Sequence, residues 1–213
     1  MPGRNPREEE DMKLYVAPGP NSYRVRIFMA EKGIELPLVP IDFAKREHKS
    51  PEFLKLNSLG QVPVLEFDDG TVITESVAIC RVLEDLHPSP PLFGTDAKSK
   101  GKIEMWNRRL EQEVFATIGN VVLHTEEFFK ERVVQVPEFA ETQKGAIPGK
   151  WAWLDREMSD GRAYLAGDDF SVADISGMVT LWLSEVFGFE IPPSLENVQR
   201  WNARLRQRPS WNA

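Results

Sequence analysis

The stretch QVPVLEFDDGTVITES, residues 61–76, decides the fold of this chain. Pro63 lies within what otherwise reads as a buried strand. Because proline has no backbone N–H, it must lie at the start of that strand or at an edge of the sheet. Neighbouring backbone groups are then left to pair with something else, and the backbone of a ligand would serve. Asp69-Gly70 predicts a tight hairpin turn, after which Val72-Ile73 returns as the partner strand.

An acid and a hydroxyl follow this hairpin directly. Thr74-Glu75-Ser76 opens a segment with apolar residues at helical spacing, which predicts a helix that runs to Leu86. The start of a helix is positively polarised, so its backbone N–H groups and the Ser76 hydroxyl suit a carboxylate. Together with the preceding strand, these residues predict a site for a small peptide that carries a carboxylate and an amine.

Composition narrows the class of protein. The chain has 213 residues and a mass of 24.3 kDa, which allows one large or two small domains. A net charge of -7 and a pI near 5.2 argue against a nucleic-acid partner, because phosphate contacts need clustered Lys and Arg. Cys80 is the only cysteine, which excludes an internal disulfide and a Cys-rich zinc site. The three histidines, His48, His87 and His124, are too scattered for a metal pattern, so we expect no metal.

The ends of the chain and its apolar runs indicate where the protein resides. Residues 1–11 lack the apolar core of a secretory signal, and we expect a disordered tail there. No run approaches the roughly 20 apolar residues that span a bilayer. These absences favour a cytoplasmic protein with no membrane partner.

The first predicted domain covers residues 12–88. Residues 13–17 read as a strand that ends at a Pro-Gly-Pro loop, and Asn21 or Ser22 can cap the helix that follows. A second strand at residues 36–41 completes a strand, helix, strand unit, which is the parallel crossover that brings its loops to one edge of a sheet. A helical turn after Pro51, the hairpin and the helix after Thr74 complete a β-α-β-α-β-β-α order.

The second predicted domain, residues 96–213, is all-helical and follows a proline-rich linker at residues 89–95. Residues 97–129 predict one long amphipathic helix, with apolar residues at 103, 106, 110, 114, 118 and 121. Pro137 and Pro148 are expected to interrupt the next segment before helix resumes at Trp151. Ser171 and Asp174 form a capping-box pattern that opens a nearly apolar helix, which should therefore be buried.

Three segments, residues 57–65, 74–79 and 164–174, together resemble the cytosolic glutathione transferase family, in particular its bacterial, theta-like and nu-like members with a Ser/Asn turn. The resemblance covers residues 12–211 and implies an α/β thioredoxin-like N-terminal domain with an all-α C-terminal domain. It also implies a homodimeric detoxification enzyme that uses glutathione as cosubstrate.

The resemblance implies how glutathione is held. Pro63 is expected to be cis, and Val62 to pair its backbone with the cysteinyl part of the tripeptide. Glu75 is expected to bind the ligand ammonium, and Ser76 with its backbone N–H the carboxylate. In theta-like members, positions that match Gln61 and His48 hold the glycyl end.

The residue that activates the thiol is less clearly marked. The family uses a donor at the first strand-to-helix turn, and where related bacterial enzymes carry Ser or Thr this chain has Gly19. A hydroxyl or amide beside a helix N-terminus stabilises a thiolate, so we rank Ser22 first, Asn21 second and Tyr23 third. Helix capping alone accounts equally well for Ser22 and Asn21. Cys80 is expected to be a small core residue.

The second substrate is expected to bind against the helical domain. Candidate pocket residues are Tyr23, Trp106, Arg109 and Glu113, although aromatic residues at helical spacing are more often core or subunit contacts. The resemblance implies transfer of glutathione to a small hydrophobic electrophile. One alternative is a glutathione-dependent disulfide reductase or peroxidase of the same fold, and a second is a noncatalytic binding module, which has no need of a γ-glutamyl site.

Overall fold

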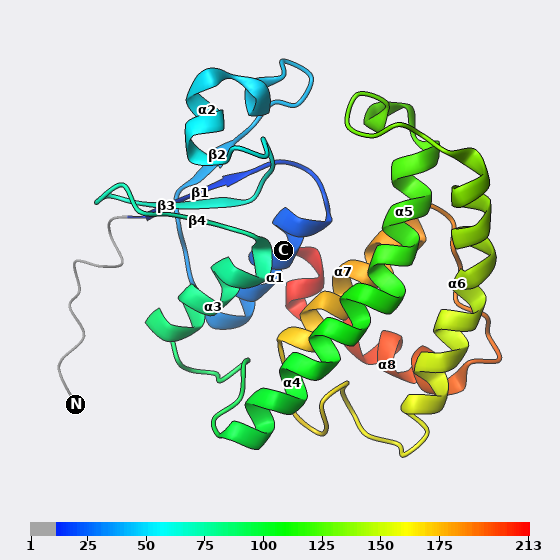
Figure 1. Ribbon diagram of the computed structural model, residues 1–213. Helices are drawn as coiled ribbons and strands as arrows, with labels where there is room; N and C mark the ends of the chain where they lie inside the picture. The colour runs from blue at the N-terminus through cyan, green and yellow to red at the C-terminus, as the bar shows by residue number, and fades with distance from the viewer. Residues whose placement is uncertain (1–11) are drawn as a thin grey trace. The chain divides into compact units, whose positions relative to one another are not determined.

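The computed structural model describes residues 12–213, so the tail expected at residues 1–11 lies outside the described part. The chain divides into two compact units between Pro90 and Pro91, within the segment that the sequence suggests as a linker (Figure 1). Each unit is described by itself.

The first unit is a four-stranded mixed sheet with helices, in the order that the sequence predicts. Its sheet order is β2-β1-β3-β4, with β1 parallel to β2 and antiparallel to β3. Figure 1 shows α1 and α3 on one face of this sheet and α2 on the other. The elements are β1 (Met12–Val16), α1 (Pro20–Lys32), β2 (Leu38–Pro40), η2 (Glu47–Lys49), α2 (Pro51–Leu56), β3 (Val64–Phe67), β4 (Val72–Thr74) and α3 (Ser76–Leu86).

The strand register brings four loops to one edge of the sheet. Tyr15, near the end of β1, lies opposite Val39 of the parallel strand β2 and Val64 at the start of the antiparallel strand β3. Val64 in turn pairs with Thr74, the last residue of β4. The loops before α1, after β2, before β3 and after β4 therefore lie at the same edge.

Proline and glycine mark the turns of the hairpin. Pro63 directly precedes the central strand β3, so it removes no hydrogen bond from the ladder, and its peptide bond is cis as predicted. Gly70 has a φ of 83°, a conformation that glycine adopts without cost, and it closes the turn between β3 and β4. The hairpin prediction is confirmed.

The start of α1 differs from the prediction that Asn21 or Ser22 caps it. The cap is Gly19, and Pro20 is the first helical residue. Proline suits that position because its φ is already helical and its missing N–H would have no partner there. Asn21 and Ser22 therefore lie inside the first turn, where backbone N–H groups lack helical acceptors.

The core of the first unit lies between the sheet and the pair α1 and α3. Its fully buried side chains include Leu14, Phe28, Leu65, Ile79 and Cys80. The expectation that Cys80 is a core residue is confirmed.

The second unit consists of helices only. They are α4 (Ala97–Arg109), the π-helical turn η3 (Leu110–Phe115), α5 (Ala116–Thr125), η4 (Glu127–Phe129), α6 (Pro137–Glu157), α7 (Val172–Val186), α8 (Glu196–Arg206) and η5 (Pro209–Asn212). With the mixed sheet of the first unit, this confirms the predicted fold class.

The predicted long helix is present over residues 97–125, as α4, η3 and α5 in succession. All six residues of its predicted apolar face are buried, at 8% exposure or less. The helix ends at Thr125 rather than at residue 129, because the chain extends at Glu126 before the short turn η4.

The prediction that Pro148 interrupts a helix is wrong. Helix α6 runs through Pro148 without a break, and Pro137 is its first residue. Proline inside a helix removes one backbone hydrogen bond and costs about 3 kcal/mol. Packing offsets this cost, because Ile147, Trp151 and Leu154 on the same helix are all buried.

Helix α7 forms the centre of the second unit, as its apolar sequence predicts. Its capping box is present: the fully buried Asp174 accepts hydrogen bonds from the Leu165 and Ser171 N–H groups, the Ser171 hydroxyl and the Trp201 indole.

Within residues 12–213, no helix combines the length and apolar character needed to cross a bilayer.

Candidate functional site

The loop before β3 carries the open backbone edge expected of a peptide-binding site. Within residues 12–213, no other residue makes a hydrogen bond with the backbone of Val62. The residues on either side are fixed: the Asn57 amide donates to the Gln61 carbonyl at 2.8 Å, and Val64 pairs in the sheet. Val62 therefore offers its N–H and C=O from a held loop.

The loop after β4 presents the acid and the hydroxyl. Glu75 is exposed and has a φ of 68°, which is uncommon for a residue other than glycine and costs of order 1–3 kcal/mol. Such conformations cluster at functional sites. Ser76 follows as the first residue of α3, and its side chain is buried.

The first turn of α1 contains the candidate thiol donors. Ser22 is only 3% exposed, and its oxygen accepts the Ala17 N–H at 3.3 Å. Asn21 is exposed, and Tyr23 is half-buried. Of the three candidates, Asn21 is thus the most accessible to a ligand.

Arg24 contacts two of the candidate site residues and was not singled out from the sequence. It is 2% exposed, and its Nη1 donates both to the Ser76 oxygen at 2.6 Å and to Asn21 Oδ1 at 3.2 Å. One nitrogen therefore joins the first turn of α1 to the first residue of α3. An arginine on a helix usually lies on a face exposed to solvent. The only sequence signal was the spacing of three residues between Asn21 and Arg24, which places the two side chains on one side of a helix.

His48 lies in η2, at the same sheet edge. Burial, and to a smaller degree the charges of Lys49 and Arg46, lower the pKa of His48. Its ring meets that of Phe43 edge-on at 4.6 Å, and its Nδ1 is buried without a hydrogen-bond partner. A neutral imidazole of this kind can both donate and accept a hydrogen bond.

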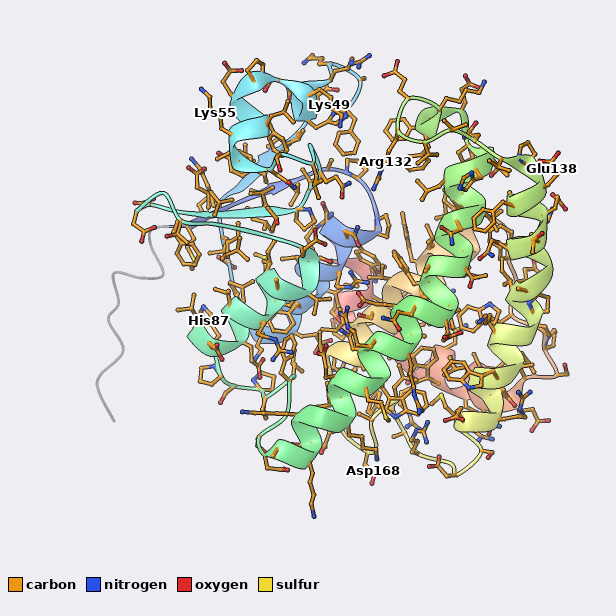
Figure 2. All side chains as sticks on the ribbon, in the orientation of Figure 1. Lys49, Lys55, His87, Arg132, Glu138 and Asp168 are labelled. Atoms are coloured by element: carbon orange, nitrogen blue, oxygen red, sulfur yellow. The ribbon has the colours of Figure 1, made fainter. Side chains whose placement is uncertain are left out.

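The loop that carries Gln61 packs closely against η2. Gly60 has a φ of 61°, and a Cβ there would lie 2.6 Å from the His48 carbonyl oxygen. Only glycine permits this approach, which brings the Gln61 loop beside the His48 segment. Figure 2 labels Lys49 on that segment.

The candidate second-substrate residues of the helical unit separate into two groups. Trp106 is 3% exposed and packs 6.2 Å from the Trp153 ring. Arg109 and Glu113 line a pocket of about 550 Å³, where they form ion pairs with Glu157 and Lys150 of α6 respectively. Trp106 is not among the residues that line this pocket.

Metal chemistry has no ready donor set in the described part of the chain. Among residues 12–213, no group of three or more His, Cys, Asp or Glu side chains could hold a metal ion.

Comparison with known proteins identifies the family. Residues 10–85 match the family described as "Glutathione S-transferase, N-terminal domain", and residues 124–209 match "Glutathione S-transferase, C-terminal domain". The chain belongs to the glutathione S-transferase family.

Individual relatives agree with this assignment. The chain is 36% identical to Glutathione S-transferase 2 of Saccharomyces cerevisiae over 207 residues, which cover 95% of this chain and 88% of the relative. It is 29% identical to Glutathione S-transferase theta-2 of Homo sapiens, covering 86% of this chain and 75% of the relative. A solved glutathione S-transferase domain-containing protein of Marinobacter aquaeolei VT8 superposes with a TM-score of 0.87 at 34% identity, covering 93% of this chain and 99% of that one.

Proposed function

We propose that this chain binds glutathione at the described edge of its first unit and activates the thiol for attack on a small hydrophobic electrophile. The observation that carries the proposal is the strand register, which gathers the open Val62 backbone and the starts of α1 and α3 at one edge. Each feature matches one group of the tripeptide: Val62 the cysteinyl backbone, Glu75 the ammonium and Ser76 the carboxylate. Gln61 and His48 are proposed for the glycyl end.

The first turn of α1 supplies the thiol chemistry in this proposal. A free thiol has a pKa of about 8.5, and lowering it by about two units requires roughly 2.7 kcal/mol of extra stabilisation of the anion. One charge-assisted hydrogen bond, worth about 1.5–3 kcal/mol, supplies most of this. The donors are the first-turn N–H groups together with the Asn21 amide or the Ser22 hydroxyl, and the exposure of Asn21 favours the amide.

The reaction follows from that stabilised anion. Glutathione releases its thiol proton to solvent, and the thiolate sulfur forms a bond to the electrophilic carbon. The bond from that carbon to its leaving group, or to the oxygen of a strained ring, breaks and its electron pair leaves with that group.

Calorimetry with two ligands tests the binding proposal. Glutathione is expected to bind, and the dipeptide cysteinylglycine, which lacks the γ-glutamyl ammonium and carboxylate, is expected to bind far more weakly. Equal affinity for the two ligands would exclude the proposed roles of Glu75 and Ser76.

A disulfide reductase of the same fold is the second candidate. Cys80 is fully buried, so the attacking sulfur in this reaction would come from glutathione and not from a protein cysteine. Here the thiolate attacks a small disulfide, forms a mixed disulfide and releases the other sulfur as a thiolate. Assays with a halo-aromatic, an epoxide, a peroxide and a small mixed disulfide separate the two reactions. Binding of glutathione without turnover of any of them would favour the noncatalytic module.

The pocket beside Arg109 and Glu113 is our candidate for the second substrate. Replacing Arg109 with Met removes its ion pair with Glu157 and is expected to change the KM for the second substrate while the affinity for glutathione is kept. Trp106 and Tyr23 do not line this pocket, and their role in binding the second substrate stays a prediction.

We also infer a cytoplasmic homodimer from the family resemblance. Light scattering at micromolar concentration tests the dimer, and a mass near 24.3 kDa with no larger species would contradict it.

A further inference from the structure

The buried guanidinium of Arg24 touches both ends of the proposed glutathione site. Its Nη1 lies 3.2 Å from Asn21 Oδ1, beside the proposed sulfur position, and 2.6 Å from the Ser76 oxygen, beside the proposed carboxylate position. We propose that Arg24 is a positioning residue that orients the Asn21 amide and the Ser76 hydroxyl and so couples the two ends of the bound tripeptide. This inference rests on the proposed function.

The chemistry of arginine fixes the direction of both contacts. A guanidinium carries only donors, so the group that Asn21 turns toward Arg24 has to be its carbonyl oxygen. The Asn21 NH₂ group then points away from Arg24 and is available to a sulfur anion. The Ser76 oxygen also accepts from Arg24, which leaves the Ser76 proton free to be donated to a carboxylate.

Burial holds the Arg24 guanidinium and its contact with Ser76 in place, and the exposed Asn21 is held by its hydrogen bond from this fixed guanidinium. Arg24 is 2% exposed and Ser76 is 5% exposed, so water does not compete freely for their hydrogen bonds. Arginine also stays protonated at every pH at which the protein is folded, so the two acceptors are held in one orientation throughout. Both ligand-facing donors are therefore set in advance of binding, which lowers the entropy lost when the ligand binds.

The same helix offers a matched control. Lys32, at the other end of α1, also carries a buried cation that contacts α3, through an ion pair with Glu84. Its other hydrogen bonds go to the carbonyl oxygens of His87 and Pro90, and none goes to Asn21 or Ser76. Lys32→Met thus removes a buried α1 to α3 contact without touching the proposed site.

The experiment measures two quantities in the full-length protein: the affinity for glutathione by calorimetry, and the apparent pKa of the bound thiol from ultraviolet absorbance of the thiolate. Wild type is compared with Arg24→Met, Arg24→Lys and Lys32→Met. We expect Arg24→Met to weaken binding about tenfold and to raise the thiol pKa by about one unit, which correspond to the same free energy. Arg24→Lys should recover part of both, and Lys32→Met should change neither.

A double-mutant cycle tests the coupling without altering Arg24. Asn21 and Ser76 lie on different helices, but both accept a hydrogen bond from the same Arg24 nitrogen. The effects of Asn21→Ala and Ser76→Ala on glutathione affinity should therefore be non-additive. Wild-type affinity and thiol pKa in Arg24→Met, or additive effects in the cycle, would overturn the inference. If wild type itself fails to bind glutathione, the proposed function fails first and the inference with it.

Discussion

The two ends of helix α1 each hold a buried cation that reaches α3, but their partners differ in kind. At the first end Arg24 donates to two neutral oxygens, of Asn21 and Ser76, whose other hydrogen-bonding groups stay available. At the second end Lys32 is enclosed by a carboxylate and two backbone carbonyls, of Glu84, His87 and Pro90. Figure 2 labels His87 at the end of α3, where this second cluster lies.

This difference separates a structural group from one that serves a ligand. The acceptors around Lys32 have no donor left to offer, so the cluster only joins α1 to α3 and to the chain that leaves the first unit. The acceptors around Arg24 carry protons of their own, from the Asn21 amide and the Ser76 hydroxyl. Substitutions at the Lys32 end should therefore change the free energy of unfolding, and substitutions at the Arg24 end should change ligand measurements.

The largest expected effect is at the structural end. Replacing Lys32 with Met breaks its ion pair with the carboxylate of Glu84, a residue that is only 8% exposed. Breaking a buried ion pair by removing one partner costs about 3–5 kcal/mol, so we expect a loss of that size in the free energy of unfolding. Urea unfolding measures it.

The double variant Lys32→Met/Glu84→Leu is the control for this prediction. Replacing both partners of a buried pair by apolar residues is often close to neutral, so much of the stability should return. If the single variant loses less than about 1 kcal/mol, the pair is no more than a surface salt bridge in its effect, and the comparison fails at this end.

A second structural group lies in the helical unit and extends the comparison to pH. Burial raises the pKa of Asp174 to about 6, although hydrogen bonds from Leu165, Trp201 and Ser171 act in the opposite direction. The folded state therefore holds this proton more tightly than the unfolded chain, whose Asp pKa is about 3.9. The stability that Asp174 contributes is fully present below about pH 4 and is lost as the pH rises through about 6.

The expected loss between these limits is about 3 kcal/mol, since each pKa unit corresponds to about 1.4 kcal/mol. Urea unfolding of wild type and Asp174→Asn from about pH 4 to about pH 7 isolates it as the difference between the two proteins. A difference that stays constant, or grows with pH, would mean that the four donors keep the carboxylate ionised throughout.

The comparison also shows what the sequence could predict. Pro63, the Asp69-Gly70 turn and the helix that follows Glu75 each carry a local signal, and they predicted the hairpin and its sheet correctly. The apolar spacing from 103 to 121 predicted the buried helix face for the same reason. The course of α6 through Pro148 was missed, because it depends on packing between helices that no local pattern records.

The candidate site divides in the same way. Val62, Glu75 and Ser76 follow from neighbouring residues in one stretch, so the sequence could name them. The contact from Arg24 to Ser76 joins residues 52 positions apart, and an arginine in a helix gives no sign of burial. The sequence also could not rank Ser22 and Asn21 as thiol donors by their exposure, because the exposed fraction of each side chain became known only with the fold.

Substitution of Glu75 tests the proposed ligand-binding end of the comparison, and its expected effect is of intermediate size. Replacing it with Ala should weaken glutathione binding by about 1.5–3 kcal/mol, the worth of a hydrogen bond to a charged group. Because Glu75 is exposed, this substitution should leave the free energy of unfolding nearly unchanged. Calorimetry and urea unfolding measure the two effects separately.

Glu75→Gly is the matched variant for the same position. It removes the carboxylate as Ala does, but glycine adopts the φ of 68° without strain, so it should be more stable than Glu75→Ala by about 1 kcal/mol. Unchanged glutathione affinity in both variants would remove Glu75 from the site.

The smallest expected effect concerns the two candidate thiol donors, Ser22 and Asn21. They lie in a single turn of α1, and one is buried while the other is exposed. Ser22 is buried and its oxygen accepts the Ala17 N–H, so Ser22→Ala should mainly cost stability, about 1–3 kcal/mol for a buried donor left without a partner. Asn21 is exposed and held by Arg24, so Asn21→Ala should raise the apparent pKa of bound glutathione by about one unit, or about 1.4 kcal/mol.

Ultraviolet absorbance of the thiolate against pH ranks the two variants, with Tyr23→Phe as the control that keeps the ring. If Ser22→Ala raises the thiol pKa more than Asn21→Ala does, the hydroxyl turns toward the sulfur when glutathione binds, and the sequence-based ranking holds against the order that burial suggests.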